Sequence, residues 1–348
     1  MGLFSRKSDV AELKASSDFE GLADVLKTSD DEQRRNAVEA IAELGDPAAV
    51  APIVSMMGRL RTRAESYESA EEAIGRLGPA AVDPLVSLVR KGELAAASQL
   101  ARLGESIALE PLRDVSRDPD PGAREAAFGG LNELATPDAR AILAEAIESG
   151  AGRKEALFAV RVQAGGGDPR IIRAVFTALR ESADLRDEAI GVLNSLARRI
   201  RDGEVGADVL TELVAATGDG DPDVRVAALL ALGAATPEDG QLHPQTAEAM
   251  LAALSDENEG VRVVGARALS EAGDHRAYDA LVSLLPSDNE QVVAGAAAGL
   301  GDLGDPSALP AIRERIESRS DLSNQVTLLL CRTRDDLKKK EKQLAKGG

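Results

Sequence analysis

Few side chains in this sequence could support catalysis or hold a metal ion. The 348 residues include two histidines, His243 and His275, and a single cysteine, Cys331. A pair of histidines would need carboxylate ligands to complete a metal site, and surface-loop positions are the simpler interpretation of both. The sequence also lacks a glycine-rich phosphate loop, a nucleophile elbow and paired cysteines with zinc-ligand spacing. It therefore predicts no catalytic residues, no metal site and no cofactor.

One local cluster could bind a partner. Arg59, Arg61 and Arg63 lie close together in the sequence, and Tyr67 follows them. Arginines beside an aromatic residue are typical of binding surfaces, including those for nucleic acids. The chain, however, carries a net charge of −18 and contains no tryptophan, so binding to nucleic acid is not expected. We predict that this cluster binds a protein, and an ordinary solvated helix face is the alternative.

These side chains must be positioned by a repeating helical pattern, which is clearest in Gly220–Thr236. Asp221 and Pro222 predict a turn followed by a helix, because proline suits the first helical turn. Ala228 and Leu232 then lie four residues apart on one helix face, and further apolar residues lie off that face. A helix that is apolar over most of its circumference must be covered on more than one side, so it belongs in a stack of helices.

The same stretch recurs about ten times, with spacings of 26 to 39 residues between the small residues that mark it. That column of small residues consists of Ala37, Ala70, Ala96, Ala127, Ala156, Ala189, Ala228, Gly265 and Ala296. A second column, four residues later, is apolar and consists of Ile41, Ile74, Leu100, Leu131, Val160, Leu193, Leu232, Leu269 and Leu300. We predict that the small residues let neighbouring helices approach and that the larger ones fill the layer between them.

The recurring pattern Asp-Pro-x-x-Arg-x-x-Ala-x-x-Ala-Leu-Gly-x-Leu-Gly-Asp-Pro resembles HEAT repeats of the short, phycobilin-lyase-like type. Clear copies are residues 34–47 and 299–306, and the resemblance covers roughly residues 19–330. It implies an all-α fold, a right-handed α-solenoid of about ten HEAT-like helix pairs. Residues 1–18 would form an N-terminal extension, 19–330 the solenoid, and 331–348 a C-terminal capping helix with a basic tail. The pairs are expected at approximately 19–45, 46–78, 79–104, 105–135, 136–166, 167–203, 204–235, 236–273, 274–304 and 305–345.

A third column, three residues before the small one, contains arginine in six of nine repeats. These arginines are Arg34, Arg124, Arg153, Arg186, Arg225 and Arg262. Aspartates precede three of them by four residues, at positions Asp30, Asp120 and Asp221. In repeats that resemble these, an aspartate of the turn pairs with the arginine between neighbouring repeats. The resemblance therefore implies that the arginines form a structural ladder of ion pairs.

The resemblance also extends to enzymes, which the residues of this chain do not support. HEAT-like deoxyhypusine hydroxylases hold two irons through several His-Glu motifs, whereas His243 and His275 are followed by Pro244 and Arg276. A phycobilin-lyase role would need a bilin and an acceptor cysteine on a partner, and the repeat carries no residue diagnostic of it. We therefore predict a non-enzymatic protein–protein interaction scaffold or adaptor that binds on the concave face or at irregular repeats. The alternatives are a bilin-lyase-like or other enzyme accessory protein, and an adaptor in a taxis or signalling complex.

Charge and composition indicate what kind of partner the chain binds and in which cellular environment it works. Residues 337–348 carry +4, so the preceding chain carries −22, and the partner is expected to be a protein with a basic surface. The chain has ten lysines against 31 arginines, an acidic and lysine-poor composition that resembles that of salt-adapted prokaryotes. Cys331 falls in the apolar column of the last repeat and is expected to be buried. A lone cysteine, no apolar run of about 20 residues and no secretory leader predict a cytoplasmic monomer without a transmembrane segment.

Overall fold

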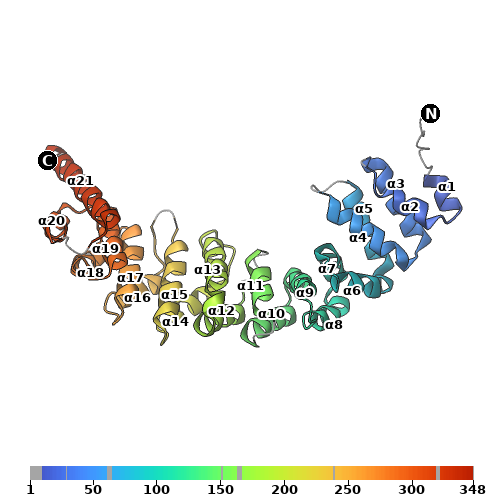
Figure 1. Ribbon diagram of the computed structural model, residues 1–348, viewed down its shortest axis with the longest axis horizontal. Coiled ribbons are helices and arrows are strands. Elements are labelled where there is room, and N and C mark those ends of the chain that lie inside the picture. Colours follow the sequence, from blue (N-terminus) through green and yellow to red (C-terminus); the bar gives the residue numbers. More distant parts are fainter. Residues whose placement is uncertain are drawn as a thin grey trace. The chain divides into compact units, whose positions relative to one another are not determined.

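The computed structural model describes residues 10–28, 30–60, 65–149, 152–162, 167–237, 240–318 and 322–347. Within these ranges all regular secondary structure is helical, which confirms the all-α fold. The chain divides into two compact units, residues 1–165 and 166–348. In Figure 1, unit 1 is coloured from blue to green and unit 2 from green to red.

Unit 1 consists of a short leading helix, α1 (Val10–Ala15), and five helix pairs. The helix α1 packs against both helices of the first pair. The pairs are α2 (Phe19–Val25) with α3 (Asp31–Leu44), α4 (Val50–Arg59) with α5 (Glu65–Leu77), α6 (Val82–Val89) with α7 (Leu94–Arg102), α8 (Glu105–Val115) with α9 (Pro121–Leu134), and α10 (Pro137–Ser149) with α11 (Arg153–Val162). Short 3-10 helices, η1 (Pro47–Ala49) and η2 (Gly78–Ala81), lead into α4 and α6.

Unit 2 also consists of five helix pairs, so the ten pairs expected from the repeat pattern are all present in the described chain. They are α12 (Pro169–Glu181) with α13 (Arg186–Arg201), α14 (Ala207–Ala216) with α15 (Pro222–Ala234), α16 (Pro244–Ala253) with α17 (Glu259–Glu271), α18 (Tyr278–Leu284) with α19 (Glu290–Leu303), and α20 (Leu309–Glu317) with α21 (Asn324–Gly347). The 3-10 helices η3 (Ala183–Leu185), η4 (His275–Ala277) and η5 (Pro306–Ala308) precede α13, α18 and α20.

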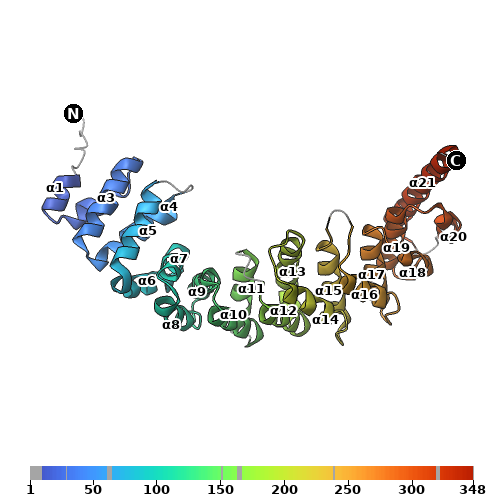
Figure 2. The same cartoon turned by 180° about the vertical axis from the view of Figure 1, so that it is seen from behind.

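Within each unit the pairs stack so that like helices contact like helices. The second helices of unit 2 pack in the order α13, α15, α17, α19 and α21. In unit 1 α3 packs on α5, α7 packs on α9, and α9 packs on α11. The first helices form a second layer through contacts such as α6 with α8 and α12 with α14. Figures 1 and 2 show the two layers of unit 2 from opposite sides. Each helix is therefore covered by its pair partner and by its neighbours in the layer.

The two predicted columns form the centre of this stack. Every residue of the small column and of the apolar column is buried. The packing at Gly265 shows why one column must be small. A Cβ atom on that glycine would lie 2.7 Å from the Cβ of Ala253 and 3.1 Å from the carbonyl oxygen of Met250. The α16 and α17 helices therefore approach so closely that no larger side chain fits between them.

The last pair departs from the predicted register. The buried residues of α21 include Val326, Leu330 and Leu337, and Cys331 is only half-buried. The prediction that Cys331 occupies the buried apolar column is therefore wrong by one residue, because Leu330 takes that place. The predicted domain boundary between residues 330 and 331 lies inside the single helix α21.

Candidate interaction surface

The predicted binding cluster is only partly described. Arg61 and Arg63 lie outside the described residues, whereas Arg59 is the last residue of α4 and Tyr67 lies half-buried in the first turn of α5. The Arg59 guanidinium donates to the Ser55 hydroxyl at 2.8 Å and to the Leu26 carbonyl of the preceding pair at 3.4 Å. These bonds hold Arg59 against its own repeat array, and a role of the cluster in partner binding stays a prediction.

The turns inside three helix pairs share one construction. The side chain of a first aspartate accepts the backbone N–H of the residue two positions later. That second residue is the N-cap of the second helix of the pair. An arginine six positions after the first aspartate donates to the backbone carbonyl oxygen of that aspartate. The residues in these three roles are Asp118, Asp120 and Arg124; Asp219, Asp221 and Arg225; and Asp256, Asn258 and Arg262. The arginine thus closes each turn from within.

The aspartate four residues before the arginine has a different role from the one predicted. The side chains of Asp30, Asp120 and Asp221 each accept a backbone N–H of their own helix as N-caps. Pairing each arginine with that aspartate was therefore wrong. The reason is that a capping carboxylate is held by the helix N-terminus, so the guanidinium binds other acceptors.

Several arginines of the third column do reach the next pair. Arg124 donates to Glu155 at 2.6 Å, and Arg186 donates to Asp223 at 2.5 Å. Arg34 donates to the Ser66 hydroxyl at 3.3 Å and pairs with Asp31 at 2.6 Å. Arg153 and Arg262 instead donate to carbonyl oxygens within their own pairs. Arg153 donates to Glu148 at 2.5 Å, and Arg262 donates to Asp256 and Glu257 at 2.7 and 3.1 Å.

The best-formed connection joins Arg225 on α15 to Asp256 in the α16–α17 turn. Both guanidinium–carboxylate distances are 2.8 Å, and both side chains are largely buried. Burial alone would raise the pKa of Asp256. The hydrogen bonds from Arg225 and from the Asn258 N–H, together with the Arg225 charge, lower it below its ordinary value. The pair therefore ties two neighbouring repeats together while Asp256 is ionised.

We propose that Arg225 is a structural link, and Asp256→Asn should lower the free energy of unfolding by about 1–3 kcal/mol at neutral pH. Because the pKa of Asp256 is lower in the folded protein, its contribution is present above the unfolded value and is lost as the pH falls through the folded one. The difference between wild type and variant should therefore shrink below about pH 4. Urea unfolding followed by circular dichroism measures both effects.

Glu257→Gln provides the matched control for this prediction. The Glu257 side chain is 92% exposed and lies 3.9 Å from the same guanidinium. Its removal should change stability by less than about 0.5 kcal/mol. Equal effects of the two substitutions would show that the buried pair does not link the repeats.

The histidines and the cysteine do not come together. His243 precedes α16 and His275 opens η4, both exposed, and Cys331 lies in α21. Within the described ranges no group of three or more His, Cys, Asp or Glu residues is placed to hold a metal ion. The absence of a metal site stays a prediction for the chain as a whole.

The outward row of the second helices, meaning their exposed residues, contains apolar side chains in both units. In unit 1 Leu94 on α7 is 55% exposed and Phe158 on α11 is 39% exposed, and exposed carboxylates such as Glu39, Glu68 and Glu72 accompany them. In unit 2 Leu230 on α15 is 46% exposed, and Leu328 on α21, at 71%, is the most exposed of these apolar residues. Apolar side chains that remain this exposed in a folded helix layer mark a candidate interaction surface.

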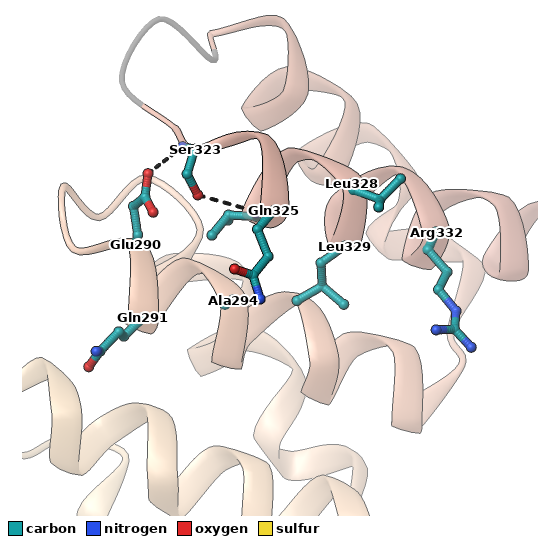
Figure 3. A pocket seen from close by; sticks show the side chains of 9 residues that line it. Glu290, Gln291, Ala294, Ser323, Gln325, Leu328, Leu329 and Arg332 are labelled. Carbon is teal, nitrogen blue, oxygen red and sulfur yellow. Dashed lines mark hydrogen bonds between the residues drawn. The ribbon is translucent and has the colours of Figure 1, made fainter.

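A groove of about 560 Å³ lies beside Leu328, between α19 and α21. Its lining residues are Glu290, Gln291, Ala294, Ser323, Gln325, Val326, Leu328, Leu329 and Arg332. Figure 3 shows Glu290 and Arg332 at opposite ends, with the Glu290 carboxylate accepting the Ser323 N–H. The volume is within the range of binding pockets in proteins. We refer to these nine residues as the C-terminal groove.

Sequence reasoning did not identify the C-terminal groove. Its α21 residues recur at helical spacing, with Gln325, Leu328, Leu329 and Arg332 on one helix face. The signal that could have identified it is the apolar pair Leu328 and Leu329, because Leu328 lies at a position that the repeat pattern leaves outward. The prediction placed the column residues one position too late in this helix, so the outward face could not be recognised.

Comparison with known families supports the repeat assignment. Residues 210–298 and 247–327 match HEAT repeats, and residues 33–58 match the PBS lyase HEAT-like repeat. No curated protein matches the chain. None of the helices in the described part of the chain is long and apolar enough to cross a membrane. None of these findings bears on salt adaptation, which stays a prediction from composition.

Solved structures of similar fold are karyopherins. Kap121p bound to Pho4p matches with a TM-score of 0.54 and 16% sequence identity, covering 96% of this chain and 42% of the karyopherin. Kap121p bound to the extreme C-terminus of the protein phosphatase Cdc14p matches with a TM-score of 0.53 and 15% identity, with the same coverage of both chains. The chain thus spans less than half of these larger proteins. At this identity the similarity concerns the fold alone.

Proposed function

This chain is an all-α solenoid that contains HEAT repeats, and we propose that it is a non-enzymatic scaffold that binds another protein. The observation that supports this most directly is the outward face of the second helices in unit 2, with an exposed Leu328 beside the C-terminal groove. An exposed apolar residue next to a concave site is characteristic of protein interfaces. The karyopherin Kap121p, which shares the fold, is seen bound to Pho4p and to a segment of Cdc14p.

Charge supports a partner with a basic surface. The chain carries −18, and the outward row of unit 1 exposes the carboxylates of Glu39, Glu68 and Glu72. Complementary charge raises the rate of association and suppresses wrong partners more than it adds affinity. We therefore expect the partner to associate more slowly at high salt, because screening shortens the range of this attraction.

Affinity capture from the native host, at matched salt, tests the scaffold function. We expect one stoichiometric protein partner on the full-length chain, and a purified protein that is colourless and free of metal. An Arg59→Ala, Arg61→Ala, Arg63→Ala variant examined in parallel tests whether the predicted cluster contributes. Recovery of bound pigment or metal without any protein partner would instead support an enzyme or an enzyme accessory protein.

A further inference from the structure

We propose that the C-terminal groove binds an amphipathic helix of the partner, with apolar side chains on Leu328 and Leu329 and carboxylates facing Arg332. This inference rests on the proposed scaffold function and specifies where and how the partner is bound. Helices bind grooves of this kind through anchors at i, i+3, i+4 and i+7. The described chain contains no strand whose edge could pair with an extended peptide, so a helix is the fitting occupant.

The floor of the groove allows a helix to approach closely. Among the groove residues α19 contributes the small Ala294, and Gly295 follows it on the side toward α17. There the Val263 side chain of α17 lies 2.7 Å from where a Cβ of Gly295 would be. The small face of α19 therefore lies between larger side chains of α17 and α21. Interaxial distances depend on the side chains at the contact, so a partner helix can lie closer here than over a row of long side chains.

The apolar wall is provided by the last second helix of unit 2. Leu328 is 71% exposed, and Leu329 beside it is half-buried. Covering an exposed leucine favours association, because its apolar surface is removed from water. A partner helix in the groove would cover Leu328.

The charges of the groove specify the chemistry of that helix. Arg332 is exposed and forms no ion pair with any residue that the structure describes. Beyond it α21 has more lysines than carboxylates, although Lys339 pairs with Asp336 and Arg334 with Asp335. At the other end the Glu290 carboxylate accepts the Ser323 N–H. Carboxylates on the partner helix would therefore pair with Arg332, and arginine is among the residues that most often dominate interface energies.

The charge of Arg332 discriminates between partner helices, because a lysine-rich helix would meet it with like charge. The charges of the chain also orient the partner: its basic surface faces the acidic repeats, and an acidic helix faces Arg332. Charges of opposite sign at these two positions fix how the partner is aligned on the chain more strongly than a surface of one sign would.

Two synthetic peptides test the groove directly. Each is about 18 residues long, which permits a helix on binding, and carries leucines at i, i+3, i+4 and i+7. One has glutamates beside the leucine stripe and the other has lysines. Fluorescence anisotropy with the full-length protein should show at least about tenfold tighter binding of the glutamate peptide. Equal binding, tighter binding of the lysine peptide or no binding of either peptide would overturn the proposal.

Three variants sharpen the test. Leu328→Glu should abolish binding of the glutamate peptide, and Arg332→Glu should reverse the preference between the peptides. Leu94→Glu is the matched control, because Leu94 on α7 is 55% exposed and lies in unit 1. Melting curves verify that each variant is folded. Reduced binding with Leu94→Glu equal to that with Leu328→Glu would show that the effect is nonspecific.

Capture from the native host then separates this inference from the scaffold function. If Leu328→Glu retained the partner and neither peptide bound, the groove would not be the binding site, and the scaffold function would still stand. If the wild-type chain captured no protein partner, the proposed scaffold function itself would be contradicted. Loss of the partner in Leu328→Glu and its retention in Leu94→Glu is the result that supports both.

Discussion

Leu232→Asp should abolish the cooperative unfolding transition of the repeats around α15. Leu232 lies in the apolar column and is buried between α15 and its neighbours. A carboxylate there would lose its hydration without gaining a partner, and unpaired burial of a charge is among the few changes that cost more than about 4 kcal/mol. This is comparable to the whole stability of many domains. Circular dichroism on heating should show a much lower melting temperature or no transition.

The control for this prediction lies two residues away on the same helix. Leu230 is 46% exposed on the outward face of α15. Leu230→Asp makes the same chemical change but leaves the carboxylate in water, so stability should change by less than about 1 kcal/mol. If both variants melted like wild type, the apolar column would not be the core of the stack.

Gly265→Val should destabilise unit 2 by about 3 kcal/mol or more. The Cβ of the new side chain would meet the Cβ of Ala253 at 2.7 Å and the Met250 carbonyl oxygen at 3.1 Å. Both obstacles are fixed to the α16 backbone and cannot move aside as the end of a long side chain could. The two helices would have to separate, which would open the layer on both sides. Urea unfolding should show a lower midpoint.

Gly75 provides the matched control in unit 1. It lies inside α5, and a Cβ atom there would meet nothing within 4 Å. Gly75→Val should leave stability unchanged or raise it by a few tenths of a kcal/mol, because valine has a higher helix propensity than glycine. A similar loss in both variants would mean that valine disfavours the helix itself and that close packing at Gly265 is not the cause.

The sequence alone determined the helix pairs and their core. Proline after aspartate starts helices such as α15, and small and apolar residues four apart mark the buried face, so both features are local and readable in one dimension. Residues such as Ala228 and Leu232 are buried as the column pattern predicted. The same small set of signals recurs in each repeat, which is why the pattern predicted ten pairs, all of which are present.

Only the tertiary structure decided which residues meet between repeats. Arg225 reaches Asp256, 31 residues away, because Asp221 is already used as a helix cap. A sequence pattern shows the spacing within a repeat, but the partner of a long side chain depends on how neighbouring repeats are placed against each other.

The C-terminal groove shows the same limit. Its two walls, α19 and α21, are separated in sequence by α20, and a register shift of one residue in α21 moves Leu330 into the core and leaves Leu328 outside. The helices and their core follow from local periodicity, whereas the groove follows from packing between α19 and α21, which are not adjacent in the sequence.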